Sequence, residues 1–146
     1  MVTSILIIVF SLVLLMYWFR YTCLLILRTR APKDFSAEVA EANRLAYPLV
    51  RERLQQAAEL DPLAESLAHD YRLLSYLLRH TVGLQMGGMT IEQRMLSFDF
   101  QLMRVWYALT RNFATSQARF ALQEMSDILG HFANAMGERT AVTRAY

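Results

Sequence analysis

The N-terminal segment of this 146-residue chain is the feature that most limits how it can fold. Residues 2–19 read VTSILIIVFSLVLLMYWF and contain no charged side chain, and the apolar run resumes after Arg20 and ends near Leu27. A helix needs about 20 apolar residues to cross the hydrocarbon core of a bilayer, which is roughly 30 Å thick. A helix over residues 3–28 would measure about 39 Å. We therefore expect a transmembrane anchor over residues 1–30.

The residues at the C-terminal end of this run are typical of a membrane interface. Tyr17 and Trp18 are the aromatic residues that gather at headgroup level, and the side chain of Arg20 is long enough to reach the headgroups. Arg28 and Arg30 follow and complete a basic collar. Because these arginines all follow the span and no basic residue precedes it, the positive-inside tendency predicts a cytoplasmic C-terminal domain.

A cleaved signal peptide is the alternative to an anchor, and the sequence argues against it. A cleaved signal peptide would need a basic N-terminal region and small residues at a cleavage site, and residues 1–4 and the bulky residues after the apolar core offer neither. The single cysteine, Cys23, rules out an intramolecular disulfide. Because Cys23 lies in the anchor, we expect it to act as a small buried apolar side chain, and palmitoylation of its thiol is the alternative.

Composition and net charge both differ between residues 1–30 and the rest of the chain. Hydrophobic residues make up 55% of the chain, mostly through the anchor, against about 45–50% in soluble domains. Residues 1–30 carry a net charge of +3 and residues 31–146 a net charge of −1. The basic pI therefore comes from the collar, and the sequence does not predict binding to nucleic acid.

The remaining chain predicts an all-α fold, a small helical hairpin or bundle with a long C-terminal helix. We expect a linker over 31–36, a helical domain over 37–136 and a flexible tail over 137–146. Apolar residues recur every three or four positions in three segments. These segments are 37–60, 62–84 and 91–136.

Several residues predict where these helices bend, begin and end. Pro48 should kink the first segment near Arg44, and Asp61-Pro62 should begin the second. Thr90 and Gln93 form a capping-box pattern at the start of the third. The glycines Gly83, Gly87 and Gly88 should end the second segment.

The third segment carries the predicted interaction surface. Neither proline nor glycine interrupts residues 91–129, and Ala114–Gln117 is the only weak point, so we favour one continuous helix over two. A stripe in its first half should pack against the preceding helix: Leu102, Trp106, Leu109 and Phe113. A stripe in its second half would then project uncovered and bind a partner: Phe120, Met125, Ile128 and Phe132. A break would instead close a four-helix bundle.

The sequence offers little catalytic chemistry. Glu65 with His69, and Asp127 with His131, have the helical i,i+4 spacing, but the Glu-x-x-His pattern of di-iron bundles is absent. We expect these four residues to pair at the surface, and we predict no catalytic residue, no metal site and no cofactor. Asp70 and Asp99 are expected to form ion pairs with arginines on the solvent side.

These observations favour a non-catalytic, single-pass membrane-anchored accessory subunit that contacts lipid and other subunits of a membrane complex. A self-associating signalling or scaffold protein is the alternative, and a metal-binding or enzymatic bundle is the third class.

Overall fold

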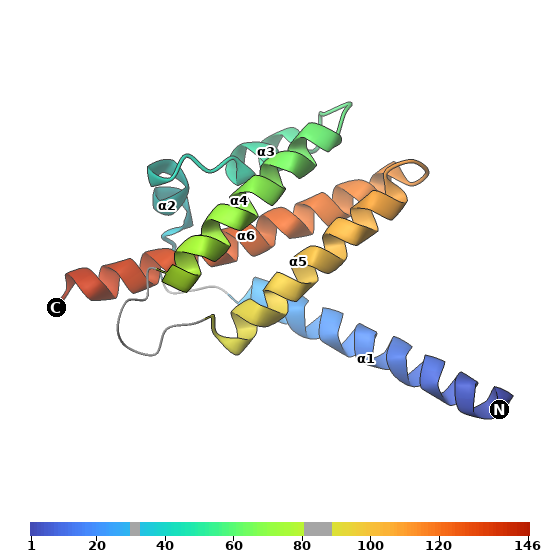
Figure 1. Ribbon diagram of the computed structural model, residues 1–146. Coiled ribbons are helices and arrows are strands. Elements are labelled where there is room, and N and C mark those ends of the chain that lie inside the picture. Colours follow the sequence, from blue (N-terminus) through green and yellow to red (C-terminus); the bar gives the residue numbers. More distant parts are fainter. Residues whose placement is uncertain (30–32, 81–88) are drawn as a thin grey trace. The chain divides into compact units, whose positions relative to one another are not determined.

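The computed structural model describes residues 1–29, 33–80 and 89–146, and all regular structure in these ranges is helical (Figure 1). The chain separates into two compact units, Met1–Arg30 and Ala31–Tyr146. The first unit is helix α1, Val2–Arg28. Large apolar side chains are exposed along it, and it is long and apolar enough to cross a membrane.

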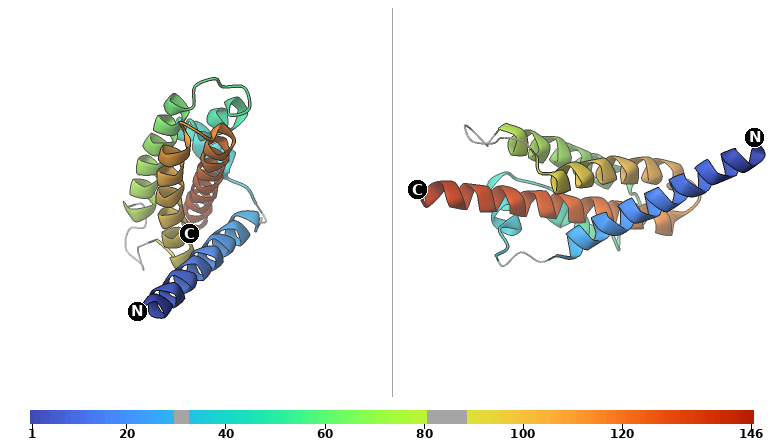
Figure 2. Two further views of the ribbon diagram at one scale, coloured as in Figure 1. Left: turned by 90° about the vertical axis from the view of Figure 1, so that its right-hand side faces the viewer. Right: turned by 90° about the horizontal axis from the view of Figure 1, so that it is seen from below.

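The second unit is built on three long helices, α4 (Asp61–His80), α5 (Ile91–Thr110) and α6 (Thr115–Arg144). They run alongside one another, with α5 antiparallel to the other two (Figures 1 and 2). The short helices α2 (Ser36–Ala42) and α3 (Tyr47–Arg53) also pack against α6.

Helix α6 is the centre of this unit, because it packs against α2, α3, α4 and α5. A helix with neighbours on several sides must carry apolar side chains on more than one face, and α6 does so. Its buried large side chains are Leu122, Met125, Ile128, Leu129 and Phe132. Small buried residues of the same helix, such as Ala121 and Gly137, allow neighbouring elements to approach closely.

The predicted continuous helix over 91–136 is wrong. Helix α5 ends at Thr110 and α6 begins at Thr115. The chain therefore reverses over residues 111–114, next to the weak point that the sequence showed at Ala114–Gln117. The reversal interrupts one helix but brings the apolar second half back onto α4 and α5. Burying several large side chains, each worth about 1.5–3 kcal/mol, outweighs the few hydrogen bonds lost at the turn.

The helix predicted over 37–60 is also divided. Residues Asn43–Ala46 form a turn between α2 and α3 in which Arg44 has a φ of 52°, and Pro48 lies in the first turn of α3. The backbone therefore breaks, rather than kinks, at the predicted position. The amides of Ala46 and Tyr47 at the start of α3 donate to Asp70 of α4, which compensates for the break.

The helix boundaries at α4 and α5 agree with their local signals. Helix α4 begins at Asp61, and the Thr90–Gln93 capping box is confirmed by both of its hydrogen bonds. The predicted end of the second segment, with Gly83, Gly87 and Gly88, lies outside the described residues. At the C-terminus, the flexible tail predicted over 137–146 is helical as far as Arg144, because Gly137 is buried against Phe35 and holds the helix in place.

Candidate interaction surface

The stripe predicted to bind a partner belongs mostly to the core. Met125, Ile128 and Phe132 are fully buried between the helices of the second unit, and only Phe120 is exposed, at 51%. The reason is the turn between α5 and α6, which folds the stripe inward. These three side chains therefore cannot form a preformed docking surface.

Asp70 also differs from its predicted role. It lies 2% exposed on α4, and its Oδ2 accepts the amides of Ala46 and Tyr47, each at 2.7 Å. Burial raises the pKa of Asp70, and the two amide hydrogen bonds oppose that rise. Asp70 thus holds the start of α3, while Asp99 is likewise buried rather than on the solvent side.

The two predicted carboxylate–histidine pairs are replaced by other partners. His69 Nδ1 lies 3.7 Å from the Oδ1 of Asp70, and Asp127 Oδ1 accepts from Arg51 at 2.8 Å. Burial lowers the pKa of His131. Within residues 1–29, 33–80 and 89–146, no group of three His, Cys, Asp or Glu side chains is placed to hold a metal ion.

Other polar side chains of the second unit join its helices. The Gln93 Oε1 that accepts from the Thr90 amide also accepts from Arg139 of α6 at 3.1 Å, and Arg139 donates in addition to the Leu78 carbonyl near the end of α4. At the other end of the bundle, the Tyr107 hydroxyl donates to Asp61. These contacts tie α4, α5 and α6 together and therefore serve the fold.

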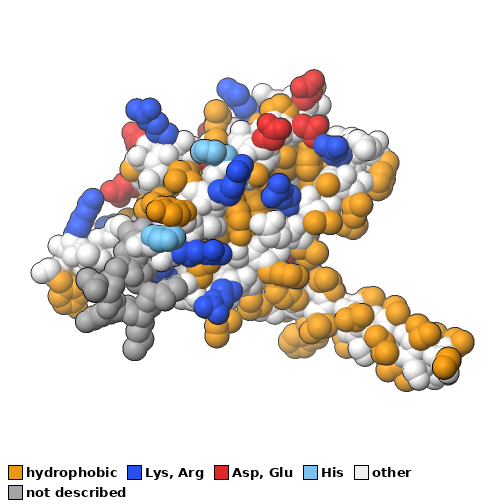
Figure 3. Space-filling model, in the orientation of Figure 1, with side chains coloured by type: hydrophobic (Ala, Val, Ile, Leu, Met, Phe, Trp, Pro, Cys, Tyr) orange, Lys and Arg blue, Asp and Glu red, His pale blue; other side chains and the backbone are white. Residues whose placement is uncertain are grey.

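Among the described residues of the second unit, one side of α5 carries exposed apolar side chains, although Met95 and Leu102 on that side are half-buried. Its residues alternate spacings of four and three, and we call them the outer α5 face: Ile91, Met95, Phe98, Leu102, Val105 and Leu109. Ile91 is 78% exposed, Val105 57% and Leu109 58%. Figure 3 shows hydrophobic side chains at the surface over α5 and over its turn into α6.

The stripe that the sequence predicted to face the preceding helix contains residues that are exposed instead. Leu102, Trp106, Leu109 and Phe113 were expected to be covered, yet Trp106, Leu109 and Phe113 are exposed. The core is formed instead by a second set on the same helix: Leu96, Phe100, Met103 and Tyr107. Both sets have helical periodicity, and the presence of two such sets on one helix was the signal for an exposed apolar face.

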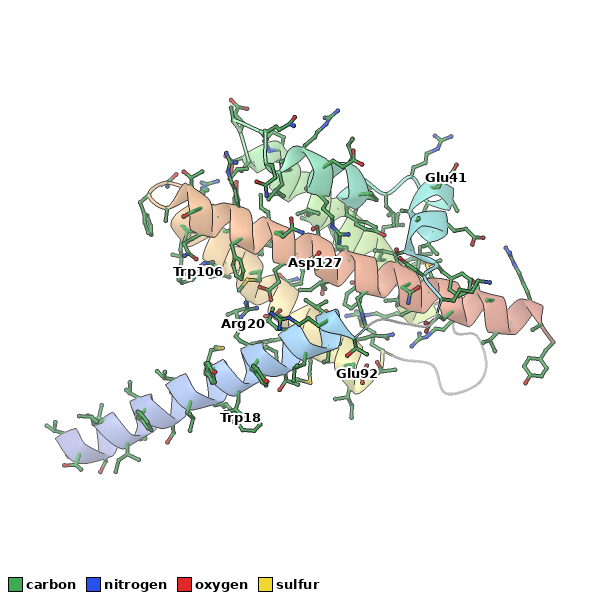
Figure 4. The ribbon with its side chains drawn as sticks, turned by 180° about the vertical axis from the view of Figure 1, so that it is seen from behind. Trp18, Arg20, Glu41, Glu92, Trp106 and Asp127 are labelled. Atoms are coloured by element: carbon green, nitrogen blue, oxygen red, sulfur yellow. The ribbon has the colours of Figure 1, made fainter. Side chains whose placement is uncertain are left out.

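Charged side chains are also exposed on α5. Arg94 and Arg104 are exposed on α5, and Glu92 is the only exposed acidic residue of that helix. Trp106 lies toward the C-terminal end of α5, whereas Trp18, the other tryptophan, lies on α1 (Figure 4). The surface therefore combines aliphatic, aromatic and cationic side chains.

The anchor residues predicted from the sequence lie on α1 as far as it is described. Tyr17 and Trp18 are exposed, and the ring of Tyr17 stacks with that of Tyr21 at 6.5 Å between centroids. Arg20 and Arg28 are on the same helix, and Arg30 lies outside the described residues.

Comparison with known proteins gave no relative: no family model, no curated protein and no solved structure matches this chain.

Proposed function

We propose that this chain is a non-catalytic, single-pass membrane-anchored subunit that binds other proteins of a membrane assembly. The observation that carries the proposal is α1, a 27-residue helix whose large apolar side chains are exposed from Val2 to Trp18. In a bilayer, such a helix is covered by lipid or by the helices of neighbouring proteins. The helical domain that follows is then held at the membrane surface.

The second unit supports a binding role over a catalytic one. Its buried or partly buried polar side chains Asp70, Gln93 and Tyr107 are engaged in hydrogen bonds that hold helices together. Its exposed apolar area, on α5, is of the kind that marks interaction sites in soluble domains. The side chains thus supply structure inside and contact area outside.

The proposal is tested by extracting the full chain from its own membranes in mild detergent and measuring its size by native electrophoresis. We expect an assembly larger than the chain itself, with a second membrane protein present in fixed proportion. In the matched control, residues 2–19 are replaced by an alternating Leu-Ala helix of equal length. This helix still anchors the chain but lacks the native side chains that would contact a partner.

The control should remain in membranes and lose the second protein. A monomer in both samples would refute the proposal. A homodimer without any second protein would support the alternative, a self-associating scaffold.

A further inference from the structure

The connection between α5 and α6 stays close to a helix until Ala114. Helical hydrogen bonds continue past the end of α5, because the amide of Ala114 donates to the Thr110 carbonyl at 2.8 Å. They resume where the amide of Ala118 donates to the Ala114 carbonyl at 3.0 Å. The backbone of Arg111 is still helical, with φ −55° and ψ −30°, whereas that of Ala114 has φ −139° and ψ 78°. We call residues 111–114 the hinge.

The residues of the hinge do little to hold the chain reversed. Neither proline nor glycine occurs in it, and the N-cap of α6 is Ala114, whose side chain makes no capping hydrogen bond. Alanine is a poor N-cap residue and the best helix former. In a continuous helix, the amides of residues 115–117 would bond to the carbonyls of residues 111–113. The hinge itself therefore favours a straight helix, and the packing of α6 on the rest of the unit reverses the chain.

The buried residues of α5 and α6 would form one stripe if the helix were straight. Those of α5 recur every three or four positions, and the same spacing continues through Ala114 and along α6. A straight helix would thus present the core residues of both helices to one side. We call this stripe the α5–α6 seam: Gln93, Leu96, Phe100, Met103, Tyr107, Thr110, Ala114, Ala118, Ala121, Met125, Ile128 and Phe132.

Two straight helices of this kind can pair through their α5–α6 seams. Within one chain, α5 and α6 already pack against each other in antiparallel directions (Figures 1 and 2). In a symmetric pair, α5 of each copy would receive α6 of the other copy in the same orientation. The two helices would cross at Ala114, and the neighbouring Thr110 and Ala118 are also small, so the backbones can approach closely.

An exchanged α6 would make the same contacts as in the single chain. Its fully buried side chains, such as Met125 and Phe132, would enter the core of the second copy. Its polar contacts would re-form in the same way, including that of Asp127 Oδ1 with Arg51 at 2.8 Å. The helical hydrogen bonds of the hinge would be gained. The opposing cost is the freedom of motion lost when two chains associate, so the balance depends on concentration.

We propose that the chain forms a dimer by exchanging α6 between two copies, with α5 and α6 of each copy joined into one continuous helix through the hinge. The reversed hinge belongs to the single chain and the straight hinge to the dimer. Exchange of an identical element is a low-cost route to a symmetric dimer. The hinge and the exchanged contacts named above lie within the second unit, so the exchange is independent of the proposed function.

Crosslinking distinguishes an exchanged dimer from two chains that lie side by side. Arg51 and Asp127 form an ion pair between α3 and α6, and both side chains are close to half exposed. The full chain with Cys23→Ser, Arg51→Cys and Asp127→Cys is warmed in mild detergent to just below its Tm, cooled, and separated into monomer and dimer by size exclusion. A short bismaleimide should then link the two thiols within one chain in the monomer and between two chains in the dimer, as resolved on a denaturing gel.

A second pair of thiols is the matched control for this experiment. Asp61 and Arg111 form an ion pair between α4 and the end of α5, which both precede Ala114 and are not exchanged. With Cys23→Ser, Asp61→Cys and Arg111→Cys, the bismaleimide should link the thiols within one chain in both fractions.

Two substitutions should suppress the dimer and leave the monomer folded. Thr115→Pro places proline at the first residue of α6, where it is tolerated, but within a continuous helix it would remove a hydrogen bond and clash with the preceding turn. The dimerisation constant should fall by at least about a hundredfold. Ala114→Asn supplies an N-cap and should lower the constant by at least about tenfold. Thr115→Ala lacks the proline ring and should leave it unchanged. Helical circular dichroism checks that each variant is folded.

Three results would overturn the exchange. Dimers linked only within single chains would show side-by-side association, and a chain that stays monomeric at every concentration after warming would show that α6 does not exchange. A dimer that is linked between chains but unaffected by Thr115→Pro would show that the hinge does not straighten. None of these results bears on the association of α1 with other membrane proteins, which native electrophoresis measures separately.

Discussion

Two glycines on α6 should respond to the same substitution with opposite sign. Gly130 and Gly137 lie on the same helix, seven residues apart. A Cβ at Gly130 would meet the end of the Arg51 side chain at 3.4 Å, an ordinary contact with a group that can move. A Cβ at Gly137 would lie 2.2 Å from the Cβ of Phe35 and 3.2 Å from the Cγ2 of Val39.

The expected magnitudes follow from these distances. Replacing a mid-helix glycine by alanine should stabilise the fold by about 0.5–1 kcal/mol where there is room, as at Gly130. At Gly137 the same gain is opposed by overpacking, which costs about 1–3 kcal/mol. Rotating the Phe35 side chain leaves its Cβ in place, so the backbone must shift and the cost should lie at the upper end. We expect Gly137→Ala to be net destabilising by about 2 kcal/mol.

Thermal unfolding of the full chain in detergent, followed by circular dichroism, measures both changes. A unit of this size shifts its Tm by about 3–5 °C per kcal/mol, so the two variants should differ by about 10 °C. Gly130→Ala also controls for any general effect of alanine on α6. A Tm for Gly137→Ala equal to or above that of Gly130→Ala would refute the close approach of Phe35 to α6.

Four further predictions concern Asp70, His131 and the orientation of the domain. Asp70→Ala leaves the buried Tyr47 amide and the part-buried Ala46 amide without their acceptor and should destabilise the fold by about 2–4 kcal/mol in thermal unfolding, whereas Asp70→Asn keeps an acceptor and should cost less. Because burial raises the pKa of Asp70, the stability of the wild type relative to Asp70→Asn should fall as pH rises from about 4, and a rise would contradict this. Burial lowers the pKa of His131, so the unfolded chain binds its proton first; the Tm should fall as pH drops through about 6.5, and less in His131→Gln. A reporter active only in the cytoplasm and fused after Tyr146 should be active, and protease access to the domain from outside intact cells would show the opposite orientation.

The features that the sequence alone determined are those that depend on neighbouring residues. The apolar run of α1, the Asp61-Pro62 start of α4 and the Thr90–Gln93 capping box each act over a few residues, and each could be predicted. Pro48 indicated where the chain departs from one straight helix, although it predicted a kink and the structure has a break between α2 and α3. Asp70, however, lies more than twenty residues from the amides that it accepts, so its role depended on tertiary packing.

The tertiary structure decided which apolar residues form the core. Leu96 and Leu109 belong to two sets of equal periodicity on α5, and nothing local distinguishes them. The chain reverses between Thr110 and Thr115 without proline or glycine, because the reversal buries Ile128 and Phe132 between the helices. The gain in buried area is summed over contacts distant in sequence, so it selects the fold, whereas the residues of the turn showed only a weak point at Ala114–Gln117.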